Sequence, residues 1–276
     1  GGGSGRHLVD LARHLVRLGH AVSVIYSPQR LEARYVEQLR AAGLRALIPL
    51  PMGRNVELGD LKSLFDLRKI VRDIGPFDVV HAHSSKAGAL LRLVAPARSA
   101  RIYTPHAFRT MDPKLGVGVR IIYGAIELGL ALLCTEAVIA VSQEEAKHAR
   151  MLGIPASKIH VVLNGIDPPA DVDRSARRAE LGLLPSDVAI GFVGRLCAQK
   201  DPVRFAKSIE VAVRENASVI GIVFGDGELR EEVESIGVDR LDIVAGRNAQ
   251  DYLPAFDIFA LTSLYEGMPY VLVESL

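Results

Sequence analysis

The sequence predicts an α/β protein with parallel sheets, divided into two domains. Short apolar runs typical of buried strands alternate with longer segments in which apolar residues recur at helical spacing. One segment, 165–187, interrupts this alternation with two adjacent prolines, clustered charges and a third proline at position 185. A chain of 276 residues, 49% of them hydrophobic, is long enough for one or two domains, and the interruption favours two.

The apolar runs define the strands that we expect. In chain order these are 21–26, 45–50, 79–83, 101–104, 137–141, 160–163, 188–193, 219–224, 241–244 and 257–261. The helical patterns between them include 5–18, 31–42, 58–73 and 143–152. Because a helical crossover joins parallel strands, this order predicts parallel sheets with right-handed connections.

The apolar segment 115–140 requires a choice between a buried helix and a membrane span. Arg120, Glu127 and Glu136 interrupt it, whereas a span needs about 20 largely uncharged residues. The segment therefore predicts a buried helix followed by the strand 137–141. A helix that lies on the membrane surface is the alternative that stays open.

The composition indicates a cytoplasmic protein that does not bind nucleic acid. Lys and Arg number 33 against 32 Asp and Glu, a net charge of +1 that gives no general affinity for nucleic acid. Cys134 and Cys197 lie far apart in the sequence, which fits a reducing compartment. The Gly-rich start has neither the basic nor the apolar segment of a secretory signal.

Two carboxylates near position 270 suggest a nucleotide-sugar site. Glu266 precedes Gly267 and Pro269, which suit a loop that enters a helix, and Glu274 would lie about two turns into that helix. Helix N-termini bind phosphate, and a carboxylate accepts hydrogen bonds from sugar hydroxyls. The spacing alone is also that of an ordinary amphipathic helix.

Cations follow a neighbouring strand. Gly194 and Arg195 end the apolar run 188–193, and Lys200 follows before a helix that should begin near Asp201 and Pro202. Arg and Lys together suit a diphosphate. The strand 219–224 ends in a second Gly turn, Gly225-Asp226-Gly227. Ligands of open α/β sheets bind beyond the carboxyl ends of strands, where all these groups should meet.

These motifs resemble the retaining glycosyltransferases of family four. The resemblance rests on Gly194-Arg195-Leu196 with Lys200, Gly225-Asp226-Gly227, and Glu266 with Glu274. The first half agrees through Gly1-Gly2-Gly3, His81-Ala82-His83, Tyr103-Thr104-Pro105-His106, Ala140-Val141-Ser142 and Asn164-Gly165-Ile166-Asp167. The order of these motifs covers nearly the whole chain. The resemblance implies the GT-B fold, two Rossmann-like domains that face each other across a cleft.

The resemblance also implies roles for single residues. Arg195, Lys200 and Gly194 would bind the diphosphate of a UDP- or GDP-sugar, and Glu274 its ribose. Glu266 and His106 would act at the donor sugar as the catalytic residues, although Ala107 stands where many members have Gly. The enzyme would transfer a sugar, with retention, to a hydroxyl acceptor and would need no cofactor.

Resemblance to bacterial members suggests a place in exopolysaccharide, capsule or lipopolysaccharide synthesis. The acceptor would be a saccharide or a lipid-linked sugar, with the enzyme peripherally associated with the inner face of the plasma membrane. The alternatives are a sugar-nucleotide epimerase of the same fold and an inactive nucleotide-binding fragment.

No metal site is expected. His81 and His83 share a strand face, a spacing that can ligate metal, but no third ligand matches them in the sequence. Asp171 and Asp173 resemble the metal-binding pair of another glycosyltransferase fold, but no strand precedes them. We therefore expect a metal-independent enzyme.

The expected domains are an acceptor-side domain over 1–167, a hinge linker over 168–187 and a nucleotide-sugar domain over 188–276. Both ends of the sequence suggest that the chain is cut from a longer protein. Residues 1–5 resemble a loop that follows a first strand, and the chain stops inside the helix that carries Glu274. We expect an internal fragment with both sheets incomplete, inactive by itself.

Overall fold

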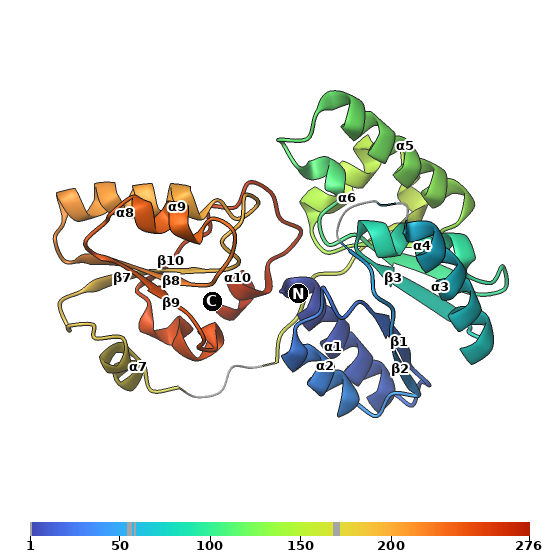
Figure 1. Cartoon of the computed structure of the whole chain (residues 1–276), viewed down its shortest axis with the longest axis horizontal. Helices are drawn as coiled ribbons and strands as arrows, with labels where there is room; N and C mark the ends of the chain where they lie inside the picture. The colour runs from blue at the N-terminus through green and yellow to red at the C-terminus, as the bar shows by residue number, and fades with distance from the viewer. Residues whose placement is uncertain (1, 54–56, 58, 168–171) are drawn as a thin grey trace. The chain divides into compact units, whose positions relative to one another are not determined.

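The structure is a computed structural model, and it describes residues 2–53, 57, 59–167 and 172–276. The chain forms two compact units, Gly1–Asn164 and Gly165–Leu276 (Figure 1). Each unit has its own parallel strands and its own apolar clusters, so each is described separately.

The described residues of the first unit form six strands in two parallel sheets. Strands β1 and β2 pair with each other, and the second sheet has the order β3-β4-β5-β6. Its elements are α1 (Gly3–Arg17), β1 (Ser23–Tyr26), α2 (Ala33–Arg40), β2 (Ala46–Pro49), α3 (Asp60–Ile74), β3 (Val79–His83), α4 (Ser85–Val94), β4 (Ala100–Thr104), the 3₁₀ turn η1 (Arg109–Met111), α5 (Val117–Leu133), β5 (Ala137–Ala140), α6 (Gln143–Met151), η2 (Ala156–Lys158) and β6 (Ile159–Val161).

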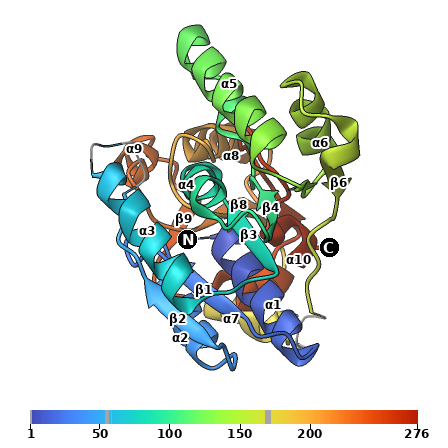
Figure 2. The ribbon, with the colours of Figure 1, turned by 90° about the vertical axis from the view of Figure 1, so that its right-hand side faces the viewer.

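Apolar faces of the helices cover these sheets. Val9 of α1 and Tyr35 of α2 pack with Val24 of β1 in one buried cluster. Tyr103 of β4 and Val138 of β5 belong to a second cluster. Figure 2 shows α4 against β3 and β4, the two strands with which it is in contact.

Helix α5 corrects one prediction. The segment forms the expected helix, but it is not buried all round, because seven of its large apolar side chains are 46–80% exposed. These are Val117, Val119, Ile121, Ile122, Ile126, Leu132 and Leu133. Its two charged residues, Arg120 and Glu127, are half-buried and buried. Among the described residues, no helix has both the length and the apolar character that a membrane crossing requires.

The second unit is built on one four-stranded parallel sheet of order β10-β7-β8-β9. Its elements are α7 (Arg174–Glu180), β7 (Val188–Val193), α8 (Pro202–Glu215), β8 (Val219–Phe224), α9 (Arg230–Ser235), β9 (Leu241–Val244), η3 (Ala249–Ala255), β10 (Ile258–Phe259) and α10 (Tyr270–Glu274).

The two faces of this sheet alternate along β8, as strand geometry requires. Val223 joins the cluster that includes Phe205 and Ile209 of α8. Its neighbours Ile222 and Phe224 join the opposite cluster, with Tyr252 of η3. The helices therefore cover both faces of the sheet, as in a doubly wound fold (Figure 1).

The segment 168–187, which the sequence predicts to be a hinge linker, contains a helix that packs on the second unit. Asp173 caps α7 by accepting hydrogen bonds from the backbone of Ser175 and Ala176. Arg174 and Arg178 of α7 pair with Asp257 at 2.5 and 3.0 Å. These residues are therefore part of the second unit, and Pro168 and Pro169 lie outside the described residues.

Candidate functional site

Three loops meet at the carboxyl edge of the second unit's sheet. Strand β7 lies between β10 and β8, so the loops that follow these three strands are neighbours. We call this group of loops, residues 194–201, 225–229 and 260–269, the strand-end site. It holds Gly194, Arg195, Lys200 and Glu266 together, as the sequence predicts.

Lys200 and Glu266 form an ion pair within this site. The Nζ atom of Lys200 lies 2.5 Å from Oε1 of Glu266. Their side chains are 15% and 22% exposed, so the pair is partly shielded and still open to a ligand. A Cβ atom at Gly194 would lie 3.6 Å from the stem of Lys200, so the lysine passes close to this glycine.

Hydrogen bonds join the loop of Lys200 to the loop of Glu266. The hydroxyl of Thr262 donates to the carbonyls of Lys200 and Asp201 at 3.1 and 2.8 Å. Leu264 donates its N–H to the carbonyl of Gln199, whose side-chain amide donates to the carbonyl of Tyr265. Lys200 and Glu266, which are 66 residues apart, are therefore placed by a fixed backbone.

The Gly225-Asp226-Gly227 turn lets the third loop approach the first. A Cβ atom at Gly225 would lie 1.9 Å from the carbonyl oxygen of Gly194, and one at Gly227 would lie 2.5 Å from that of Leu196. Both approaches are to backbone atoms, so a side chain at either position would push the loops apart.

The other predicted ligands are less tightly held. Arg195 is exposed, and its side chain has no hydrogen-bond or ion-pair partner among the described residues. Glu274 accepts a hydrogen bond from Gln250 at 2.5 Å and is the last residue of α10, a helix of five residues. The hydroxyl of Ser263 is buried and has no partner within the described part of the chain.

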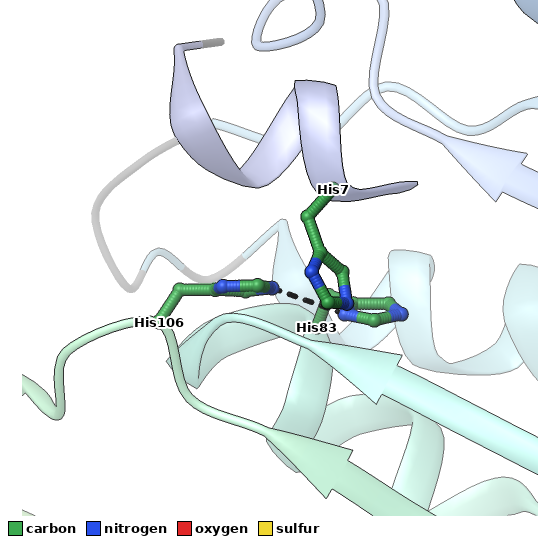
Figure 3. Close-up of side chains that lie close together, drawn as sticks. All are labelled: His7, His83 and His106. Atoms are coloured by element: carbon green, nitrogen blue, oxygen red, sulfur yellow. Dashed lines mark hydrogen bonds between the residues drawn. The ribbon is translucent and has the colours of Figure 1, made fainter. Parts of the chain in front are cut away.

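Four imidazoles gather in the first unit, and we call His7, His81, His83 and His106 the histidine cluster. Nδ1 of His83 and Nε2 of His106 form a hydrogen bond of 3.2 Å, and the ring centroids of His81 and His83 lie 4.2 Å apart. Figure 3 shows His7 reaching toward the other two labelled rings, with its centroid 4.7 Å from that of His106.

The histidine cluster is uncharged near neutral pH. Burial, followed by repulsion from neighbouring histidines, lowers the pKa of His106 to about 3 and that of His81 to about 4. Burial lowers the pKa of His7 and His83 as well. Burial disfavours the charged form of each ring, and two charged imidazoles this close would repel each other. The neutral forms are therefore favoured.

The loop that carries His106 is held in an uncommon backbone conformation. His106 and Ala107 have φ angles of 54° and 73°, in the left-handed region. The N–H of Ala107 donates to Oε1 of Glu145 at 2.6 Å, and the N–H of Val141 donates to Oε2 at 2.7 Å. Glu145 is fully buried, so its carboxylate fixes this loop against the end of β5.

Comparison with known proteins agrees with both units. The model of Glycosyltransferase Family 4 matches residues 1–169, and the model of Glycosyl transferases group 1 matches residues 187–276. The chain belongs to glycosyltransferase family 4. The GT-B assignment is confirmed as well, because this family 4 chain is similar to solved glycosyltransferases of that fold over nearly all of its length.

A UDP-Gal:α-D-GlcNAc-diphosphoundecaprenol α-1,3-galactosyltransferase of Escherichia coli is 31% identical over 249 residues, which is 84% of this chain and 64% of the relative. The chain thus spans less than two thirds of that relative. Anabaena HepE, solved with UDP and glucose, has a TM-score of 0.77 at 20% identity, covering 99% of this chain and 74% of HepE. WaaG, a glycosyltransferase involved in lipopolysaccharide biosynthesis, has a TM-score of 0.74 at 17% identity, covering 99% of this chain and 75% of WaaG.

Sequence reasoning on this family 4 chain missed two residues. Nothing in the spacing of His7 pointed to the histidines of β3 and β4, because only the fold brings α1 to them. Glu145 stands three residues after Ser142, the N-cap of α6, whose hydroxyl accepts the N–H of Glu145. That Ser-x-x-Glu pattern signals a capping box, and the carboxylate bonds Val141 and Ala107 in addition.

Proposed function

We propose that the protein is a retaining glycosyltransferase that binds a UDP- or GDP-sugar at the strand-end site and transfers the sugar to a hydroxyl acceptor. The Lys200–Glu266 pair is the observation that carries the proposal. It places a cation and a carboxylate together at the carboxyl edge of a doubly wound sheet, where such folds bind nucleotides.

The chemistry of transfer assigns a task to each residue. Negative charge develops on the departing diphosphate, and a fixed cation there lowers the barrier. Lys200 and the exposed Arg195 would supply that charge. Glu266 would accept hydrogen bonds from the donor sugar and Glu274 from the ribose. His106 keeps the role that the family resemblance implies, orienting the donor sugar.

Sugar transfer is the direct test of this proposal, and we expect it to survive excess EDTA. Asp173, one member of the acidic pair in the sequence, is already engaged in capping α7, and Asp171 lies outside the described residues. The assay incubates the whole protein with UDP- and GDP-sugars and a diphosphoundecaprenol-linked sugar, with and without chelator, and NMR reads the anomeric configuration of the product.

Other outcomes of the assay decide against the proposal. Loss of turnover in EDTA that magnesium or manganese restores would overturn metal independence. A product formed from donor alone, with no acceptor, would indicate an epimerase. Binding of nucleoside diphosphate with no turnover of any kind would indicate an inactive nucleotide-binding protein.

We propose further that the apolar face of α5, the seven exposed side chains named above, rests on a lipid bilayer. That face of the helix carries no charge, and burying it would release water from a continuous apolar surface. The E. coli relative acts on an acceptor linked to diphosphoundecaprenol, a lipid. An enzyme that acts on a lipid-linked acceptor would meet it at the membrane surface.

Vesicle flotation tests the membrane contact. The protein should float with anionic phospholipid vesicles, and I122E/I126E should reduce the bound fraction severalfold, because charged groups are costly in the interface. Leu18→Glu is the matched control, since Leu18 is 69% exposed at the end of α1 in the same unit. Equal flotation of both variants, or self-association of the protein through α5 in place of lipid binding, would contradict the proposal.

A further inference from the structure

Three members of the histidine cluster come together from separate elements. His7 lies on α1, His83 ends β3 and His106 follows β4. Each offers one ring nitrogen, and the three nitrogens all lie within 4.8 Å of one another (Figure 3). The three side chains are only partly buried, so an ion can reach them from solvent.

The spacing of the nitrogens suits a tetrahedral metal. With Zn–N bonds of about 2.0–2.1 Å, two ligand nitrogens on a tetrahedral zinc are roughly 3.3–3.4 Å apart. Nδ1 of His83 and Nε2 of His106 already lie 3.2 Å apart. An ion between them would replace one shared proton, and a ring nitrogen of His7 lies within 4.8 Å of both.

A hydrogen bond orients the third ligand. Nδ1 of His7 donates to Oδ1 of Asn164 at 3.1 Å, and Asn164 is itself buried. That bond leaves the lone pair of His7 on Nε2. Histidine ligands in metal sites characteristically donate the other ring N–H to an oxygen in this way.

The chemistry of the three donor atoms indicates which metal would bind. The ring nitrogen of a neutral imidazole is a common metal ligand. His81 does not belong to the group whose ligand nitrogens lie within 4.8 Å of one another, and its Nε2 is hydrogen-bonded to Oγ1 of Thr104 at 2.8 Å. Three neutral nitrogens suit zinc better than magnesium or calcium, which take oxygen ligands.

We propose that His7, His83 and His106 form a binding site for one Zn²⁺ ion, with a fourth coordination position open to water or an anion. The site lies within the first unit, and neither the family comparison nor the proposed transfer reaction requires it. It differs from a catalytic zinc centre in that the proposed transfer would not need it.

Calorimetry with zinc chloride on the chelator-treated chain tests the site. We expect one Zn²⁺ per chain, and Co²⁺ in its place should give the visible absorption of a tetrahedral complex. Asn164→Leu, which removes the orienting bond, should weaken zinc binding by roughly 10–100-fold. His7→Ala and His83→Ala should remove the cobalt absorption.

His14→Ala is the matched control, because His14 is an exposed histidine on the same helix as His7. It should bind zinc as the parent chain does. Circular dichroism shows which variants are folded, and Asn164→Leu still tests the site where a histidine variant is not. Absence of stoichiometric zinc, or equal affinity of the His7→Ala and His14→Ala variants, would overturn the proposal.

One consequence rests on the proposed function. Zinc bound to His106 would keep that side chain from the donor sugar, so added Zn²⁺ should slow transfer and excess EDTA should restore it. Stoichiometric zinc binding with no effect on transfer would contradict the role of His106 and leave the metal site standing. The two proposals therefore fail separately.

Discussion

Replacing Arg92 with Met should destabilise the first unit by about 3–5 kcal/mol, the usual cost of leaving one member of a buried ion pair alone. The Arg92 side chain is 1% exposed, and its guanidinium lies 2.7 Å from the carboxylate of Glu127. It also donates to the carbonyl of Gly88 and lies 3.8 Å over the ring of Tyr103. Without Arg92, the Glu127 carboxylate keeps one strong partner, the hydroxyl of Tyr103 at 3.0 Å.

Denaturant unfolding followed by circular dichroism measures this loss. R92M/E127L should recover much of the stability, because it removes both charges and leaves apolar side chains of similar volume. Arg72→Met is the control, since Arg72 and its partner Asp73 are 73% and 47% exposed and such pairs contribute about 0–1 kcal/mol. A loss below about 1 kcal/mol for Arg92→Met would show that Glu127 is neutralised by other means.

The strands were the most predictable part of the fold, because the pattern that defines them is local. All ten predicted strands are present, and 79–83, 188–193, 219–224 and 241–244 have the predicted bounds. Helix α8 begins at Pro202, near Asp201 and Pro202 as predicted, and Asp201 is its N-cap; both the cap and the first-turn proline are local signals.

Two segments differ from what their sequences suggest, because residues that are distant in the sequence determine how each segment packs. The segment 168–187 has the composition of a linker, yet α7 is held by Asp257, some 80 residues away, whose carboxylate also accepts the N–H of Ala189. The composition showed that α5 is apolar, but its burial depends on which other elements cover it. The sequence of the segment 115–140 does not indicate that one face of the helix is exposed.

In the candidate site, too, local motifs predicted the positions of residues but not the contacts between distant ones. Motif and strand order placed Lys200 and Glu266 at one edge of the sheet, but their ion pair depends on the hydrogen bonds of Thr262 and Gln199. His7 was missed because its partners are remote in the sequence. Glu145 has a local capping signal, but its bond to Ala107 joins residues 38 apart. The roles of Arg195, Glu274 and His106 in donor binding stay predictions that binding measurements must decide.

Lys200→Ala should weaken the binding of a nucleoside diphosphate by about 1.5–3 kcal/mol, the contribution of a hydrogen bond to a charged group. This corresponds to roughly a 10–150-fold rise in Kd. The lysine is the cation nearest Glu266, at 2.5 Å, so its loss removes a phosphate partner and leaves a carboxylate that repels the ligand. Isothermal calorimetry with UDP and GDP gives the two dissociation constants directly.

Three further variants test whether Lys200 binds the ligand or serves only in a structural ion pair. Arg195→Ala should cost a similar amount, because this exposed guanidinium serves no partner in the described part of the chain and its removal leaves the fold intact. Lys207→Ala, seven residues along on the exposed face of α8, removes the same charge outside the strand-end site and should leave Kd within about twofold. Lys200→Arg keeps the charge and should retain most of the affinity. Unchanged affinity in both Arg195→Ala and Lys200→Ala would mean that the diphosphate binds elsewhere and that the Lys200–Glu266 pair serves only to join two loops.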